Sequence, residues 1–73
     1  MKTIYINLHT TNEAQKFVED VSLMEGDFDL CSGRFTVDAK SLKDVLNLGL
    51  SSPLKLMVPE GTELKIFEKY KQQ

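Results

Sequence analysis

The chain has 73 residues, of which 41% are hydrophobic and 27% charged, with nine basic against eleven acidic side chains. This length excludes more than one domain and predicts one small globular unit spanning residues 1–73. The net charge of −2 argues against nucleic acid as a partner, because phosphate binding needs a massed basic surface. The longest apolar run, residues 56–58, is far too short for a membrane-spanning helix, so we expect no membrane insertion.

The first two predicted elements are a strand and a helix. Hydrophobic and polar side chains alternate over residues 2–8, which predicts a half-buried strand. The period then becomes helical, and Thr10 with Glu13 three residues later forms a capping box for an amphipathic helix that stops at Gly26. The hydrophobic positions of this helix are Ala14, Phe17, Val18, Val21 and Met24.

A β-hairpin is predicted next. Phe28 and Leu30 alternate with polar residues before the Ser32-Gly33 turn, and Phe35 and Val37 alternate with polar residues after it. Ser41 then begins a second helix of about two turns, which ends before the next glycine of the chain.

The remainder of the chain predicts one more strand and one more helix. Asp44 completes a capping box with Ser41, and a loop over residues 51–53 leads into a strand over residues 54–58. After a turn, hydrophobic residues between Leu64 and the C-terminus indicate a short, frayed helix.

The predicted order is β-α-β-β-α-β-α with one hydrophobic side per strand. This order favours an α+β fold, an open-faced β-sandwich with a four-stranded, mostly antiparallel sheet and helices on one face. The residues expected on the exposed face of the sheet are Tyr5, Asn7, Asp27, Asp29, Arg34, Thr36, Asp38 and Lys55.

The residue types available limit the chemistry. The glycines stand singly at turns, which gives no phosphate-binding loop, and one histidine with one cysteine cannot form a zinc site. We therefore expect no metal and no cofactor. Cys31 cannot form an internal disulfide, which favours a cytoplasmic location. Its expected place near Arg34 leaves a redox-sensitive thiol as one hypothesis and an ordinary strand residue as the simpler one.

Two positions can carry a phosphoryl group. His9 precedes the first helix, where free N–H groups and the helix dipole favour negative charge, but Thr10, Thr11 and Asn12 supply no cation. A solvated loop histidine is therefore the alternative. Ser41, at the start of the second helix, is either a phosphorylation site or a plain N-cap.

The second helix presents two hydrophobic stripes. Leu42 and Leu46 form one stripe, and Val45 and Leu48 form the other. A helix this short cannot bury both on one sheet, so the Leu42 and Leu46 stripe is expected to face a partner, unless both stripes pack against the neighbouring helix.

The run from Val37 to Leu42 (Val-Asp-Ala-Lys-Ser-Leu) and the run Asn-Leu-Gly-Leu at residues 47–50 resemble the second half of HPr, the phosphocarrier of the sugar phosphotransferase system. In that family a strand ends in a similar step into a short helix that closes with Leu-Gly. The predicted element order is also that of the family, so the resemblance spans the whole chain, and its specific part covers about fifteen residues. The resemblance implies the HPr-like fold.

The family's active histidine lies in a Gly-Leu-His-Ala-Arg-Pro run at the start of the first helix. Aligned without a gap, Thr10 takes the place of the histidine, and Asn12 and Glu13 take those of the arginine and proline. His9 reaches the active position only after a shift of one residue. Because the arginine that would bind phosphate through paired hydrogen bonds is missing, the resemblance implies a member that is degenerate at its phosphohistidine site.

Ser41 falls on the position that Gram-positive HPr proteins use as a regulatory phosphoserine. The resemblance implies a non-enzymatic regulatory or docking module, with phosphotransferase-system proteins or an HPr kinase as partners. The alternative is an interaction module unrelated to phosphotransfer that binds a partner through the second helix. The partner-binding residues carried over from the family are Leu42, Lys43, Leu46 and Asn47.

Overall fold

The protein is an antiparallel sheet with helices packed beneath it. The structure, a computed structural model, describes residues 1–50 and 53–71, so Ser51 and Ser52 of the predicted loop lie outside the described residues. The elements are β1 (Lys2–Ile6), α1 (Thr11–Ser22), β2 (Asp29–Ser32), β3 (Phe35–Asp38), α2 (Leu42–Asn47), β4 (Leu54–Val58) and the 3₁₀ helix η1 (Leu64–Tyr70).

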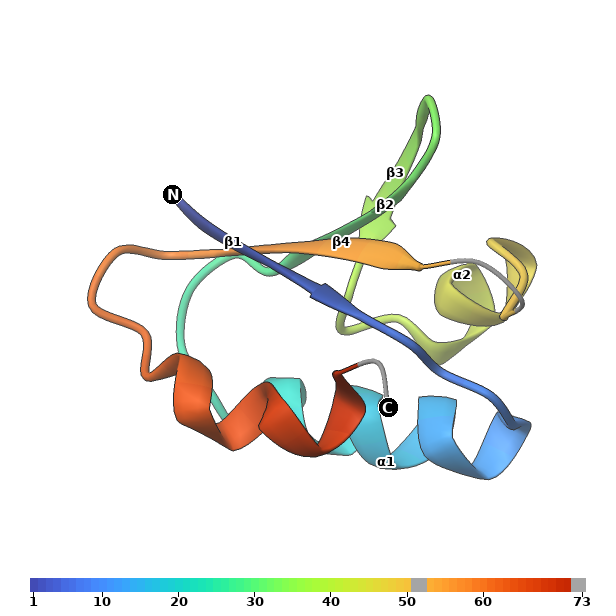
Figure 1. Ribbon diagram of the computed structural model, residues 1–73, viewed down its shortest axis with the longest axis horizontal. Coiled ribbons are helices and arrows are strands. Elements are labelled where there is room, and N and C mark those ends of the chain that lie inside the picture. Colours follow the sequence, from blue (N-terminus) through green and yellow to red (C-terminus); the bar gives the residue numbers. More distant parts are fainter. Residues whose placement is uncertain (51–52, 72–73) are drawn as a thin grey trace.

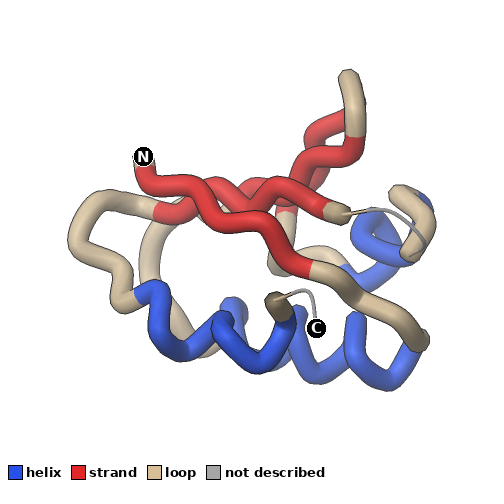
Figure 2. Tube along the Cα trace, viewed as in Figure 1, coloured by secondary structure: helices blue, strands red, loops and turns tan. Residues whose placement is uncertain are grey.

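The four strands form one sheet in the order β1-β4-β2-β3, and every ladder is antiparallel. Figures 1 and 2 show α1 and η1 under one face of this sheet, with α2 at the end of the layer and the β2–β3 hairpin standing away from the body. The α+β class and the open antiparallel four-stranded sheet predicted from the sequence are thus confirmed.

The hydrophobic core lies between the sheet and the helices. Strand register sets Ile4, Leu56 and Leu30 side by side on the inner face. Beneath them the Phe17 ring of α1 lies 6.2 Å from the ring of Phe67 in η1, measured between centroids. These side chains are buried members of the hydrophobic core, and burial of such apolar surface is the main stabilising contribution available to a chain of this length.

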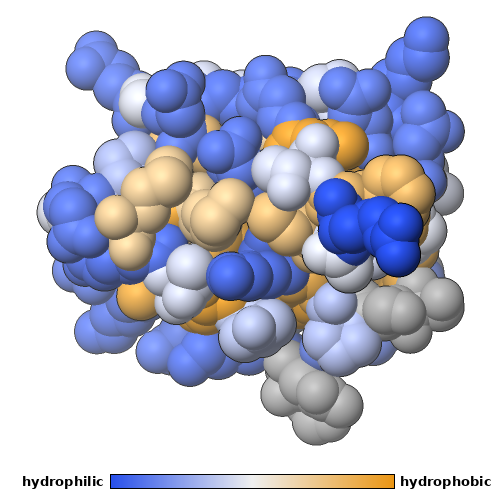
Figure 3. Space-filling view, turned by 90° about the horizontal axis from the view of Figure 1, so that it is seen from above, coloured by the Kyte–Doolittle hydropathy of each residue, from blue (hydrophilic) through white to orange (hydrophobic). Residues whose placement is uncertain are grey.

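The open face of the sheet carries mixed side chains, seen from above in Figure 3, where moderately hydrophobic groups cross a hydrophilic surface. Of the residues predicted for this face, Asn7, Asp27 and Arg34 lie outside the strands. The register forms two rows across the open face, one of Tyr5, Lys55, Cys31 and Thr36, and one of Thr3, Met57, Asp29 and Asp38.

Two predicted boundaries near the N-terminus are wrong by a few residues. The first strand ends at Ile6, because the Asn7 N–H leaves the ladder and donates to the Tyr70 carbonyl at 2.6 Å. The first helix ends at Ser22, a turn before the predicted stop, because the N–H of Met24 bonds only three residues back, to Val21. Met24 still packs half-buried against the core, which is why the helical period extends to it.

The C-terminal element is a 3₁₀ helix where an α-helix was predicted. Leu64, Phe67 and Tyr70 are spaced by three, so in a helix of three residues per turn they lie directly above one another. Phe67 and Tyr70 are buried, whereas Leu64 is half-buried. An interval of three also occurs between Ala14 and Phe17 of the α-helix α1, so this spacing did not distinguish the two helix types in the sequence.

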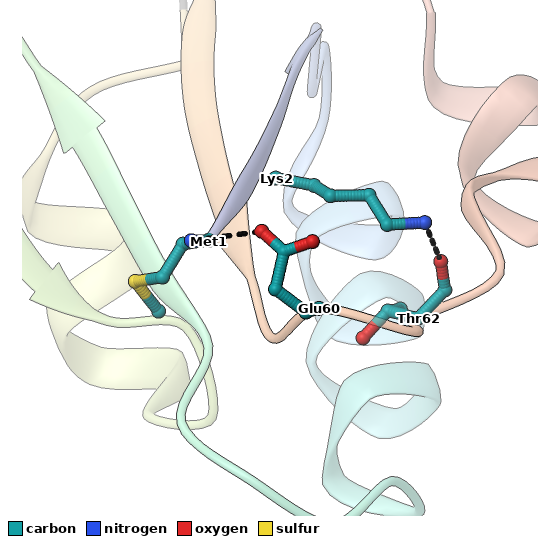
Figure 4. Close-up of polar contacts among 4 residues, drawn as sticks. All are labelled: Met1, Lys2, Glu60 and Thr62. Carbon is teal, nitrogen blue, oxygen red and sulfur yellow. Dashed lines mark hydrogen bonds and ion pairs between the residues drawn. The ribbon is translucent and has the colours of Figure 1, made fainter.

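The start of β1 is fastened to the turn that precedes η1 (Figure 4). The Met1 ammonium lies 3.0 Å from the Glu60 carboxylate, and the Lys2 ammonium donates to the Thr62 carbonyl at 2.9 Å. These contacts are exposed or half-exposed, so each contributes less than about 1 kcal/mol. Their effect is to hold the turn after β4 beside the first residues of the chain.

The Tyr70 hydroxyl joins η1 to α1. It donates to the Asp20 carboxylate at 2.8 Å, and the Lys69 ammonium lies 3.2 Å from the same oxygen. Burial of the phenol, followed by this hydrogen bond and the negative charge of Asp20, raises the pKa of Tyr70 above its ordinary value of about 10.

We expect this contact to make the protein sensitive to alkali. In the unfolded chain the phenol ionises near pH 10, whereas the folded protein holds it neutral, so the stabilisation is complete below about pH 10 and is lost above it. Tyr70→Phe removes the titrating group and a hydrogen bond to a charged acceptor, worth about 1.5–3 kcal/mol. Urea unfolding of the native protein and of Tyr70→Phe, measured below and above about pH 10, gives the difference between their free energies of unfolding. We expect this difference to shrink as the pH rises; a difference that stays constant would contradict the expectation.

Candidate functional site

The loop before α1 holds the predicted histidine. His9 is exposed, and its backbone N–H donates to the Glu13 carboxylate at 2.8 Å. The Glu13 N–H in turn donates to the Thr10 hydroxyl at 3.1 Å, so the predicted capping box is confirmed. The first turn of α1 therefore already contains a carboxylate at its positive end.

This carboxylate decides what the N-terminus of α1 can hold. A phosphoryl group on His9 or Thr10 would lie next to the negative charge of Glu13, which repels it. The ion pairs among the described residues are Met1 with Glu60 and Lys69 with Asp20, so none brings a cation to this end of α1. The arginine of the chain, Arg34, lies in the turn between β2 and β3.

Ser41 is the N-cap of α2. Its hydroxyl oxygen accepts from the Asp44 N–H at 3.4 Å, a long bond, and its own N–H donates to the Asp38 carbonyl at 3.0 Å. The second capping box is therefore half formed, because the N–H that the Asp44 carboxylate would have accepted is used by the β3–α2 turn. The half-buried Ser41 hydroxyl is consequently held less tightly than that of Thr10.

The residue before Ser41 is held firmly. The Lys40 ammonium donates to the Met24 carbonyl at 2.6 Å and lies 5.5 Å from the centre of the Phe28 ring. The Lys40 N–H donates to the Asp38 carboxylate at 2.9 Å. Lys40 thus connects the start of α2 to the segment after α1, and Lys43 is the exposed cation of α2 itself.

The structure places the predicted partner-binding residues on two sides of α2. Leu42 and Leu46 pack half-buried against the core, as Leu48 does, while Val45 is fully buried. The alternative in which both hydrophobic stripes pack therefore describes α2 better than a free leucine stripe. Lys43 and Asn47 are exposed and remain available to a partner.

A hollow of about 250 Å³ lies between α2 and β3, and the sequence did not predict it. Phe35, on the helix side of β3, is 67% exposed, although its alternation with Thr36 predicted an inward side chain. The inner row of the sheet ends here, because Phe35 pairs with Ser32 and not with a hydrophobic residue. That serine opposite an aromatic residue was the available signal. The hollow is lined by Phe35, Val37, Asp44, Asn47 and Leu48.

Cys31 lies half-buried on the open face. Its sulfur is 3.2 Å from the Thr36 hydroxyl across the hairpin, and its other cross-strand neighbour is Lys55. The contact that the hairpin supplies to the thiol is therefore a neutral hydroxyl from Thr36, where the sequence had suggested the Arg34 guanidinium. A hydroxyl does not activate a thiol as a cation does, and among the described residues the Lys55 ammonium makes no hydrogen bond to the sulfur, so these contacts favour an ordinary strand residue.

The site and fold together define a small α+β domain. The N-terminus of its helix α1 is capped by Thr10 and Glu13, and its α2 and β3 elements share an exposed surface. Compared with protein-family models, with curated proteins and with solved structures, the chain shows no match. In residues 1–50 and 53–71, metal-binding side chains do not gather in groups of three or more. Over the same ranges, each helix is too short or too polar to cross a bilayer.

Proposed function

We propose that this protein is an HPr-like regulatory or docking module of the cytoplasmic sugar phosphotransferase system that does not carry phosphate on a histidine. The proposal starts from the resemblance of residues 37–50 to HPr and from the shared element order. The observation that carries the proposal is the hydrogen bond from the His9 N–H to the Glu13 carboxylate, which places negative charge where a phosphohistidine would need positive charge. A carrier needs donors and cations at this position, and this chain has a fixed acceptor instead.

Ser41 is the phosphoacceptor that the proposal favours. Ser41 is half-buried, and the hydrogen bond that its hydroxyl accepts from the Asp44 N–H is long, at 3.4 Å, and is easily given up. A phosphate on Ser41 would place negative charge at the N-terminus of α2, where the helix dipole favours it, and near the exposed Lys43. The Asp44 carboxylate in the same turn would repel this charge. The modification would thus change the charge of the surface that meets partners without requiring the core to move.

Intact-mass measurement after two separate treatments tests the proposal. With phosphoenolpyruvate and Enzyme I we expect no added phosphoryl group, and with ATP and an HPr kinase we expect one, on Ser41. Ser41→Asn should abolish the second adduct while it preserves the helix cap, since asparagine caps as well as serine. Ser22→Ala, at an exposed serine of α1, is the matched control and should retain it.

Two outcomes would contradict this function. An adduct from phosphoenolpyruvate that disappears in His9→Ala would show that the chain is a carrier despite Glu13. The absence of an adduct under both treatments would remove the link to phosphotransfer and leave the second candidate.

The second candidate is an interaction module that is unrelated to phosphotransfer and binds a partner through α2. The hollow beside α2 with its exposed phenylalanine favours it. Asn47 is exposed and lines the hollow, so Asn47→Arg should raise the dissociation constant for a purified partner at least about tenfold. A tenfold change corresponds to about 1.4 kcal/mol, and a hot-spot contact is worth more than this. Lys16→Glu, at an exposed position of α1, is the control and should leave the binding of this partner unchanged. Equal binding by both variants would exclude α2. Leu46→Asp is less suitable, since Leu46 packs against the core.

A further inference from the structure

We infer that the protein self-associates by antiparallel pairing of β3 with β3 of a second copy, which joins two sheets across their β3 edges. The inference is independent of any phosphotransfer role. It starts from the position of β3 at the edge of the sheet, on a hairpin that stands away from the body (Figure 1). An uncovered edge strand presents unpaired N–H and C=O groups to another chain.

The hairpin geometry identifies which groups of β3 point outward. Ser32 and Phe35 flank a two-residue turn whose Gly33 has a φ of +59°, so this pair exchanges the first hydrogen bonds of the hairpin. The next pair, Cys31 with Thr36, is then a pair without ladder hydrogen bonds. The N–H and C=O of Thr36, and the N–H of Asp38, are therefore directed away from β2.

The sequence of β3, taken together with the turn residue Arg34 that precedes it, is complementary to itself in one register. When two copies pair antiparallel about Thr36, each Arg34 stands opposite Asp38 of the second copy, and each Phe35 stands opposite Val37. Asp38 uses one carboxylate oxygen, Oδ1, to accept from Lys40, and among the described residues Oδ2 makes no ion pair or hydrogen bond. Opposite charges thus meet on one face of the ribbon and hydrophobic side chains on the other.

The hollow beside α2 fits the same arrangement. Val37 lines it, and Phe35 of the second copy, opposite Val37 on the helix side, enters it from the outside. Pairing would cover two Phe35 side chains, each of which is 67% exposed in the single chain. Because Asn47 lines the same hollow, self-association would compete with a partner that binds there.

The other edge of the sheet lacks this complementarity. β1 paired with itself about Ile4 would place Lys2 opposite Ile6, with no charge pair. Beyond its last residue, the Asn7 N–H is already bonded to the Tyr70 carbonyl. The charge complementarity that favours self-pairing is therefore a property of the β3 edge and not of the β1 edge.

Sedimentation velocity over a concentration series tests the inference. We expect a monomer–dimer equilibrium for the native sequence. Thr36→Pro should abolish the dimer, because it removes an outward N–H without removing a ladder hydrogen bond to β2; of the contacts with β2 it removes the side-chain contact with the Cys31 sulfur. Arg34→Asp should weaken the dimer about tenfold or more, because each attractive pair becomes a repulsive one. Lys16→Asp makes the same charge change at an exposed position of α1, away from β3, and should have no effect on the dimer.

A mixture of variants gives the sharpest result. Arg34→Asp and Asp38→Arg should each dimerise poorly alone, whereas an equimolar mixture should recover the dimer, because both charge pairs are again opposite in sign. Circular dichroism shows whether each variant is folded. If Asp38→Arg does not fold, Thr36→Pro and Arg34→Asp are sufficient to test the inference. A native chain that stays monomeric at all concentrations overturns the inference. So does a dimer that survives both Thr36→Pro and Arg34→Asp.

Discussion

Phe67→Ala is expected to unfold the protein or to leave it barely stable. The Phe67 ring is fully buried, and its centre lies 6.2 Å from that of Phe17 and 6.5 Å from that of Phe28. Truncating a buried phenylalanine costs about 3–5 kcal/mol. At about 0.05–0.15 kcal/mol per residue, a domain of this length has only about 4–11 kcal/mol in total. One side chain of η1 therefore carries a large part of the stability.

Urea unfolding followed by circular dichroism measures this loss. Ile66→Ala is the matched control, because Ile66 is the preceding residue of η1 and is 43% exposed; it should lower the free energy of unfolding by less than about 1 kcal/mol. Equal, small effects of the two substitutions would show that η1 does not pack on the core as described.

Gly26→Ala is expected to be the next most harmful change, at about 2 kcal/mol or more. Gly26 has a φ of +106°, a conformation that strains any residue with a Cβ. An added Cβ would also lie 2.8 Å from Cγ of the Pro59 ring, which has little freedom to move. The segment after α1 and the turn after β4 approach each other closely here, and only glycine permits it.

Thermal unfolding of three variants separates the two causes. Gly61→Ala reports the backbone strain alone, because Gly61 has a φ of +90° and, its chain neighbours aside, no described atom would lie within 4 Å of the added Cβ. Adding Pro59→Ala to Gly26→Ala should restore part of the loss by removing the clash. If Gly26→Ala and Gly61→Ala are equally harmful, the close approach to Pro59 contributes nothing.

The sequence patterns predicted the sheet because each strand places one hydrophobic face on a single core. Leu54, Leu56 and Val58 alternate with less buried residues along β4, and its predicted bounds are those observed. The ends of elements were harder to predict, since they depend on partners far along the chain. β1 stops where Asn7 bonds to Tyr70, a contact across more than sixty residues that no local pattern contains.

The candidate site was predictable in part for the same reason. The Thr10 and Glu13 box is local, and spacing alone identified it. Ser41 was correctly predicted as a cap, but its N–H is bonded to the Asp38 carbonyl, so only half of the second box forms. The exposure of Phe35 could not be predicted from alternation, which assigns a face of the strand but not how far the core extends along it.

The most direct test of the docking function is a titration of the labelled protein with an HPr kinase, followed by amide correlation spectra. We expect changes that cluster at Ser41, Lys43 and Asn47 on α2, with little change at the His9 loop. Changes confined to His9 and Glu13, or no change at saturating kinase, would contradict it.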